Sequence, residues 1–450
     1  MRAIFWGLFA VVAVAPLPLG GNRPLGWSLL SLSVGLLLIL WGSILARSGG
    51  SLATPFRKLR GPFVLFTLSV AWVLIQLIPN VPLELAHPGW RELNIFFGTD
   101  VAARITIDPG WTRTILMRWL AYAGIFWLAV QLCRDRQLAR QALFGFVLVA
   151  TVYALYGIVT LFAFDNRVLV YENWLGRQAL SSTFVNRNSY ATYAGLGLLA
   201  ALALLSERWM STRRRATGAR QRIVEFLSTS VATHAYLLVA IFTISTALLL
   251  TGSRGGVAST LVALFALLLL TRRSGGKASL SGVVAQYTTV VIVIGGVFAL
   301  SSDLLVDRLQ RGDAQRAGIY QQTWNAIDDH VYGGAGLGSF PQIFQLYRYE
   351  EKPNPQFVER AHNTYLENLV ELGVPAALCL FLSIAWLAYI CWRGLGQRSR
   401  DLHYAALGCA STLLVGLHSL VDFSLQIPAV TMTYMFLMGL AVAQSFSSRR

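Results

Sequence analysis

The sequence predicts an all-α polytopic membrane protein with about twelve transmembrane helices, and three observations support this class. Of the 450 residues, 55% are apolar and only 13% are charged, which is about half the charged fraction of a typical soluble domain. The apolar residues form tracts long enough to cross a bilayer, for which a helix needs about 20 residues. Cationic residues gather in alternate loops between these tracts, as expected for a membrane protein of fixed orientation.

Each apolar tract is interpreted as one span, in chain order. The first follows Arg2 and has the length of a secretory signal, but Pro16 and Pro18 stand where a small-residue cleavage site would lie, so we expect a retained anchor. The predicted spans are residues 4–19, 25–46, 62–78, 115–133, 142–164, 189–205, 234–250, 256–270, 283–300, 372–392, 404–421 and 427–446.

The loops between the spans divide the charge unequally. With both termini on one side, that side holds most of the 37 Lys and Arg residues and few of the 21 Asp and Glu residues. The positive-inside rule places this side in the cytoplasm, so the net charge of +16 reflects orientation and not a nucleic-acid partner. Three long segments then face the other side of the membrane: 79–114, 165–188 and 301–371. We therefore divide the chain into nine spans (1–300), a large outer loop with short amphipathic helices (301–371) and three final spans (372–450).

Several kinds of site are not expected. The four cysteines lie within or at the edge of apolar tracts, so neither a disulfide framework nor a zinc site is indicated. Asp328, Asp329 and His330 are adjacent, and adjacent residues on a helix point apart, so they are not expected to share a metal. The sequence contains no Gly-x-Ser-x-Gly elbow, His-Glu-x-x-His pair or Walker loop, which argues against common hydrolase, zincin and ATPase chemistry.

Two arginines stand on the outer side, where orientation gives no reason for a cation. Arg254 lies in the glycine-rich turn 251–256 between the seventh and eighth spans. Arg187 lies at the start of the sixth span, where a cation opposes the helix dipole. Each arginine either anchors its helix at the membrane interface or binds an anion such as phosphate through its guanidinium. In the first case, Asn188 or Ser189 would cap the helix at Arg187.

His362 lies near the end of the large loop, just before the tenth span. Histidine titrates near neutral pH, so His362 is either a satisfied polar group at the interface or a general base. Glu367 and Glu371 follow at helical spacing, four residues apart, and either orient a partner or face water.

Earlier in the same loop, residues 316–327 place Tyr320, Trp324 and Ile327 on one stripe of an amphipathic helix. The helix is expected to break at the glycine-rich segment 333–338. No strand precedes these glycines, so they do not indicate a dinucleotide-binding loop.

Taken in order, these motifs resemble the O-antigen ligase and Wzy-type polymerase superfamily of bacterial envelope glycan assembly. The resemblance is carried by four outer-side motifs and the start of the last span, and is strongest from about residue 183 to residue 428. The matching segments are 182–188 (STFVNRN), 253–256 (SRGG), 334–340 (GAGLGSF), 361–366 (AHNTYL) with 371–373 (ELG), and 418–423 (HSLVDF) with 426–428 (QIP).

The resemblance implies a GT-C-like architecture in the bacterial inner membrane, with cytoplasmic termini and a periplasmic active site. It implies a glycosyltransferase that takes a glycan from undecaprenyl pyrophosphate and joins it, with inversion and without a metal or other cofactor, to an acceptor sugar on lipid A core. Carried over to this chain, Arg187 and Arg254 would bind the pyrophosphate, and His362 would activate the acceptor hydroxyl. The same comparison makes further residues candidates for substrate binding: Arg316, Arg360, Asn363, Tyr365 and Asp422.

Two alternatives remain open from the sequence. A Wzy-type polymerase would use the same donor but extend another lipid-linked repeat. A transporter or flippase would move the lipid-linked sugar without chemistry, along a path lined by charges near the bilayer midplane. Few charges lie within the spans, and Arg118 is the nearest candidate for such a path. The transferase hypothesis requires Arg187, Arg254 and His362 to converge on one outward-facing cavity.

Overall fold

The structure is a computed structural model that describes residues 1–17, 19–82, 84–169, 171, 179–215, 231–273, 303–348, 358–398 and 401–446. The regular structure in these ranges is helical, which confirms the predicted fold class. The long helices are α1 (Arg2–Val14), α2 (Pro24–Arg47), α3 (Arg60–Gln76), α5 (Pro109–Leu132), α6 (Arg136–Ala163), α7 (Arg187–Arg215), α9 (Val231–Leu250), α10 (Arg254–Arg273), α12 (Asp303–Asp329), α15 (Val374–Gln397), α16 (Leu402–His418) and α17 (Pro428–Ser445). Shorter helices are α4 (Pro88–Phe97), α13 (Phe340–Leu346) and α14 (Thr364–Leu372), and 3-10 turns cover Leu19–Gly21, Phe56–Lys58 and Ser424–Gln426.

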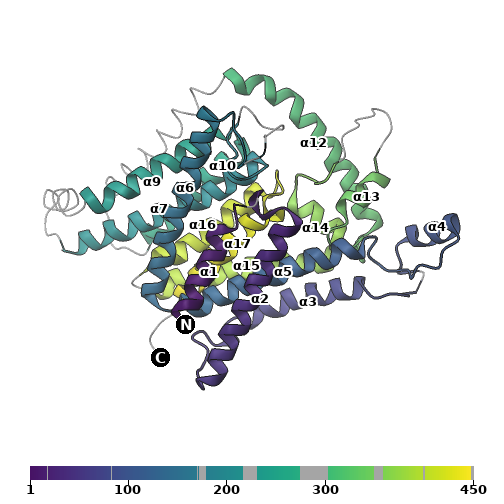
Figure 1. Ribbon diagram of the computed structural model, residues 1–450, viewed down its shortest axis with the longest axis horizontal. Helices are drawn as coiled ribbons and strands as arrows, with labels where there is room; N and C mark the ends of the chain where they lie inside the picture. Colours follow the sequence, from purple (N-terminus) through teal and green to yellow (C-terminus); the bar gives the residue numbers. More distant parts are fainter. Residues whose placement is uncertain are drawn as a thin grey trace.

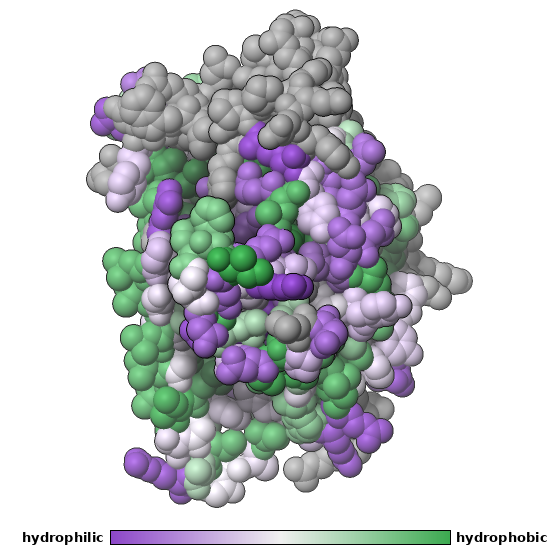
Figure 2. Space-filling view, turned by 90° about the vertical axis from the view of Figure 1, so that its right-hand side faces the viewer, coloured by the Kyte–Doolittle hydropathy of each residue, from purple (hydrophilic) through white to green (hydrophobic). Residues whose placement is uncertain are grey.

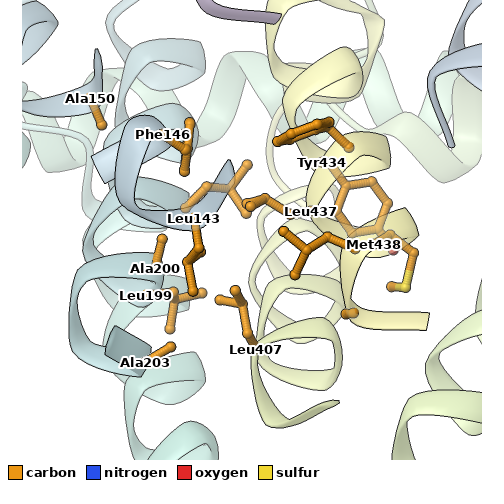
Figure 3. Packing of buried hydrophobic residues seen from close by; sticks show 14 of the residues in the cluster. Leu143, Phe146, Ala150, Leu199, Ala200, Ala203, Leu407, Tyr434, Leu437 and Met438 are labelled. Carbon is orange, nitrogen blue, oxygen red and sulfur yellow. The ribbon is translucent and has the colours of Figure 1, made fainter. Parts of the chain in front are cut away.

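Most of the long helices form a bundle with α17 in its interior, while α12 lies at one end of the bundle (Figure 1). Helix α17 is buried along nearly its whole length, against α5, α16, α15 and α7. Figure 3 shows Leu437 of α17 beside Leu143 of α6, and Leu199 of α7 beside Leu407 of α16, while Met438 points to the other side of α17. Because α17 is enclosed, the bundle has an interior as well as a lipid-facing surface.

The outer helices present apolar side chains to their surroundings. Leu25, Leu32 and Ile39 on α2 are exposed, as are Val152 on α6 and Phe265 on α10. Within the described ranges, six helices are long and apolar enough to cross a membrane (α2, α5, α6, α7, α10 and α15), and shorter apolar helices accompany them. An apolar exterior of this kind is expected where a helix bundle faces lipid.

The predicted spans coincide with helices wherever the structure describes them. Helix α1 ends at Val14, before the predicted end of the first span, because Pro16 cannot continue a helix. The ninth predicted span, 283–300, lies outside the described residues, so the count of twelve stays a prediction.

The turns that follow α3, α6, α9 and α16 meet at one end of the bundle, together with α4, α12, α13 and α14 (Figure 1). We call this the loop end. Figure 2 views it directly, with hydrophilic residues gathered across its centre and hydrophobic residues on the flanks. The loop end corresponds to the side predicted from the charge distribution to be the outer one.

Helix α12 corrects two details of the sequence prediction. It runs from Asp303 to Asp329, so the large loop contains a long helix as well as short ones. Its buried stripe consists of Ile319, Thr323 and Ile327, while the predicted member Trp324 is 53% exposed. The stripe packs against α14, so the buried face of α12 differs from the predicted one, which was wrong at Trp324.

The glycine-rich segment after α12 is a packing element. A Cβ on Gly334 would lie 2.3 Å from the Glu371 carbonyl oxygen, and one on Gly336 would lie 2.0 Å from Thr106 Oγ1. Both glycines have positive φ, at 66° and 109°, a region that side chains disfavour. The glycines therefore let this segment approach the end of α14 closely, where the Gly336 N–H donates to the Glu371 carbonyl at 3.0 Å.

Candidate functional site

Arg187 is the first residue of α7, at the loop end. The helix is capped by Asn186, whose side-chain oxygen accepts the Asn188 N–H at 2.7 Å. The expectation that Asn188 or Ser189 caps this helix is therefore wrong, because the helix begins at Arg187, two residues before the apolar tract. Arg187 is half-buried, and its guanidinium lies over Gly252, 3.4 Å from where a Cβ on that residue would stand.

Arg254 is likewise the first residue of a helix, α10. The turn before it is fixed by Thr251, whose hydroxyl oxygen accepts the Ser253 N–H at 3.1 Å, and by Ser253, whose hydroxyl oxygen accepts the Gly256 N–H at 3.3 Å. The Arg187 guanidinium packs against Gly252 in this turn, so the starts of α7 and α10 adjoin. Two helix N-termini, each beginning with an arginine, thus adjoin, and a helix N-terminus favours a bound anion.

A buried carboxylate lies beside these helix starts. Asp422 is 0% exposed and accepts from the Asn188 amide at 3.1 Å and from the Ser424 hydroxyl. The Thr192 hydroxyl, one turn along α7 from Asn188, donates to Ser424 Oγ at 2.9 Å and lies 2.6 Å from His418 Nδ1. The His418 ring in turn packs on Gly255, where a Cβ would approach the ring to 3.1 Å.

His362 lies in the short segment that leads into α14. Its backbone has φ 52°, which is uncommon for a residue with a side chain. Contacts on both sides hold this conformation: the Tyr320 hydroxyl donates to the His362 carbonyl at 2.9 Å, and Glu367 accepts the Ala361 N–H at 3.2 Å. Such strain in a well-held segment is typical of functional sites.

The His362 ring lies within this arrangement of charges. It stands edge-on to the Phe423 ring, with centroids 5.1 Å apart, one residue from Asp422. Its Nδ1 atom is buried and has no hydrogen-bond partner in the described part of the chain. A buried polar atom without a partner is costly, so this atom calls for an explanation.

Burial lowers the pKa of His362 below its ordinary value, so the imidazole is neutral at neutral pH. Two charges act on it in opposite directions: Asp422 raises its pKa and Arg316 lowers it. Arg316 reaches this point from α12, and Tyr320, one turn further along the same helix, responds to both charges as well. Helix α12 thus contributes to the same place as α7, α10 and the 360–364 segment.

We call Arg187, Arg254, Arg316, His362 and Asp422 the central site. Of the residues predicted from the sequence, these five meet at the loop end. The other three candidates, Arg360, Asn363 and Tyr365, form contacts that hold the segment around His362.

Arg360 pairs with Glu367 at 2.8 Å, and this carboxylate raises the pKa of Arg360. Asn363 caps α14, because its side-chain oxygen accepts the Tyr365 and Leu366 N–H groups at 3.0 and 3.1 Å. The Tyr365 hydroxyl donates to the Gly416 carbonyl at 2.9 Å. These three residues therefore position the segment around His362.

The two glutamates of α14 do not face water. Glu367 is 1% exposed and holds both Arg360 and the Ala361 N–H, while Glu371 is 4% exposed and accepts the Phe340 N–H at 3.1 Å. Burial and the neighbouring Glu367 raise the pKa of Glu371 to about 8. Among the described residues no group of three or more His, Cys, Asp or Glu side chains is arranged to hold a metal ion.

Thr192, Ser424 and His418 were not selected from the sequence as site residues. Their common signal is a polar side chain near the outer end of an apolar helix, which is too frequent to single them out. Thr192 and His418 are 226 positions apart, so only the fold brings them together.

Comparison with known proteins bears on the same part of the chain. Residues 239–381 match the O-antigen ligase family, a range that includes Arg254, Arg316 and His362. The chain is also 29% identical over 151 residues to a general O-oligosaccharyltransferase of Acinetobacter baylyi, an alignment that covers 34% of this chain and 25% of that protein. The chain thus spans about a quarter of the length of this relative. Both findings agree with the motifs in the sequence, and they show that residues 239–381 are similar to the O-antigen ligase family.

Proposed function

We propose that this protein is a glycosyltransferase of the bacterial inner membrane that moves a glycan from undecaprenyl pyrophosphate to an acceptor hydroxyl at the periplasmic face. The observation that carries the proposal is the neutral His362 imidazole beside Asp422 and Arg316, with Asp422 bonded to Asn188 at the start of α7. A base next to an anion-binding site is what transfer from a pyrophosphate to a hydroxyl requires.

In this proposal Arg187 and Arg254 bind the pyrophosphate of the donor. When the bond between the sugar and the phosphate breaks, its electron pair leaves with the lipid pyrophosphate, and negative charge develops there. Two guanidiniums fixed at adjoining helix starts stabilise that charge without rearrangement, since the helix N-termini add backbone N–H donors. The donor bond is already activated, so no ATP is required.

His362 acts on the acceptor as a general base. Its neutral imidazole takes the proton of the acceptor hydroxyl as the oxygen attacks the anomeric carbon from the face opposite the pyrophosphate. One C–O bond forms and one breaks, so the configuration at the anomeric carbon inverts. Asp422 then faces the imidazolium that forms and stabilises its charge.

The acceptor class is the finer part of the proposal, and we favour ligation to a lipid A core sugar over extension of a lipid-linked repeat. The relative from Acinetobacter baylyi carries the name O-oligosaccharyltransferase, which supports transfer to an oxygen nucleophile in either case. Both acceptors present a sugar hydroxyl, so His362 would play the same role in each.

Reconstitution separates these possibilities. We expect purified full-length protein in proteoliposomes, given an undecaprenyl-pyrophosphate glycan and lipid A core with a metal chelator present, to form glycosylated lipid A core. Lengthened lipid-linked glycan would instead identify a polymerase. A requirement for added metal, or movement of intact donor across the bilayer with no covalent product for any acceptor, would contradict the proposal.

A further inference from the structure

A large cavity lies beside the central site and is not part of it. Its volume is about 660 Å³, within the range of about 300–1,000 Å³ typical of sites for small ligands. It is enclosed by α3, α5, α14, α15, α16 and α17. Arg360 and Tyr365 line it, but Arg187, Arg254 and His362 do not, so the central site does not open into this cavity.

The lining of the cavity changes character along its length. At the loop end it carries polar groups, among them Arg118, Glu371 and Gln426. Toward the opposite end of the bundle the wall is apolar and rich in aromatic rings, including Phe56 and Trp127. A molecule with a polar head and a long apolar chain, oriented as in the outer leaflet, matches this distribution.

Arg118 adds a charge that the protein does not balance. It is 2% exposed, its guanidinium donates to the Tyr122 hydroxyl at 3.2 Å and to the Gln426 carbonyl, and it lies 5.3 Å from the Trp27 ring. Within the described ranges no carboxylate lies within 4.0 Å of it. A buried cation inside a membrane bundle is normally paired, so Arg118 requires an anion from elsewhere.

The other charged groups on the wall do not supply that anion. The Glu367 carboxylate is occupied by Arg360, to which it pairs at 2.8 Å. Glu371 accepts a backbone N–H, and burial raises its pKa to about 8, so at neutral pH it is mainly the uncharged acid. The lining therefore carries one net positive charge.

We propose that this cavity binds one glycerophospholipid, with its phosphodiester at Arg118 and an acyl chain along the aromatic wall. A phosphodiester carries one negative charge, which matches the single unbalanced guanidinium. A pyrophosphate carries more charge than one arginine balances, and the central site offers three arginines for it. The proposal concerns a resident lipid and does not depend on the transfer chemistry.

The experiment measures the phospholipid that full-length protein retains. We expect wild-type protein, equilibrated in detergent with phosphatidylglycerol and examined by native mass spectrometry, to keep one phospholipid per chain. Ala123 lines the cavity on α5, one turn from Trp119, so Ala123→Trp fills the space and should reduce retention about tenfold or more. Arg118→Gln should reduce it to a similar degree by removing the charged donor. Val152→Trp, at an exposed position on α6 away from the cavity, should retain the lipid as wild type does.

The variants also keep the proposal falsifiable if Arg118→Gln fails to fold. Arg118→Lys preserves the charge and should keep most of the lipid, and Ala123→Trp tests the cavity without touching the arginine. Equal retention by Ala123→Trp and Val152→Trp would overturn the proposal. So would preferential retention of undecaprenyl phosphate in a mixture with phosphatidylglycerol, since that result would assign the cavity to a polyprenyl lipid.

Discussion

Replacing His362 by alanine or glutamine should lower the rate of glycan transfer about 10³-fold, while the affinity for the lipid pyrophosphate changes little. General base catalysis contributes about 10²–10⁴-fold, and in the proposed mechanism no other group takes the acceptor proton. Glutamine keeps much of the size of histidine and can still form hydrogen bonds, but it cannot serve as a base. The measurement is the rate of product formation in proteoliposomes, together with the Kd for undecaprenyl pyrophosphate.

His330 provides the matched control for His362. It is a second histidine at the loop end, where it stacks on His87 with ring centroids 5.4 Å apart. His330→Gln should leave transfer within about twofold of wild type, because this ring has no place in the proposed chemistry. If His362→Gln lost less than tenfold in rate, His362 would not be the base.

The pH dependence of transfer follows from the two charges that act on His362. Burial lowers its pKa, so the neutral base is present above this lowered pKa, and the rate should fall only as the pH drops through it. Asp422 raises that pKa, so Asp422→Asn should move the acid limb of the rate profile to lower pH. Arg316 lowers it, so Arg316→Gln should move the limb to higher pH. Opposite shifts would identify His362 as the titrating group, and shifts in the same direction would exclude it.

The second large effect concerns the two arginines at the helix starts. Arg187→Gln and Arg254→Gln should each lower the rate of transfer about 10²–10³-fold, as expected when one fixed donor to a developing oxyanion is removed. Arg187→Lys and Arg254→Lys should recover part of that loss, because lysine restores the charge but not the paired N–H donors. If both arginines bind one pyrophosphate, the loss in the double Gln variant should be smaller than the product of the single losses.

Arg113 separates a local effect from a general effect of charge. It is an exposed arginine in the second turn of α5, at the same end of the bundle. Arg113→Gln should leave transfer unchanged, apart from a small effect of the lost surface charge at low salt. Strictly multiplicative losses for Arg187 and Arg254 would mean that they act at independent sites, against the account.

The bundle could be predicted from the sequence because burial in lipid leaves a simple pattern. A helix that crosses a bilayer must be apolar over about 20 residues, and the tracts that became α2, α6 and α15 meet that condition on their own. The details that differed depend on tertiary contacts. The buried face of α12 is the one that contacts α14. The cap of α7 is Asn186, because its side-chain oxygen accepts the Asn188 N–H.

The candidate site divides in the same way. Arg187 and Arg254 could be selected from the sequence because a cation on the outer side contradicts the positive-inside pattern and therefore needs another reason. Asp422 was a candidate from the sequence, but its hydrogen-bonded neighbours Ser424, Thr192 and His418 were not, because they are ordinary polar residues that only the fold brings together. The shift in the pKa of His362 could not be predicted from the sequence either, since Arg316 acts on it from α12.

The most direct test of the central claim is a cryo-electron microscopy structure of the full-length protein with undecaprenyl pyrophosphate bound. We predict that the phosphates contact the Arg187 and Arg254 guanidiniums and the first N–H groups of α7 and α10, and that the terminal phosphate faces His362. A pyrophosphate bound at Arg118, or elsewhere with both guanidiniums unoccupied, would contradict the account.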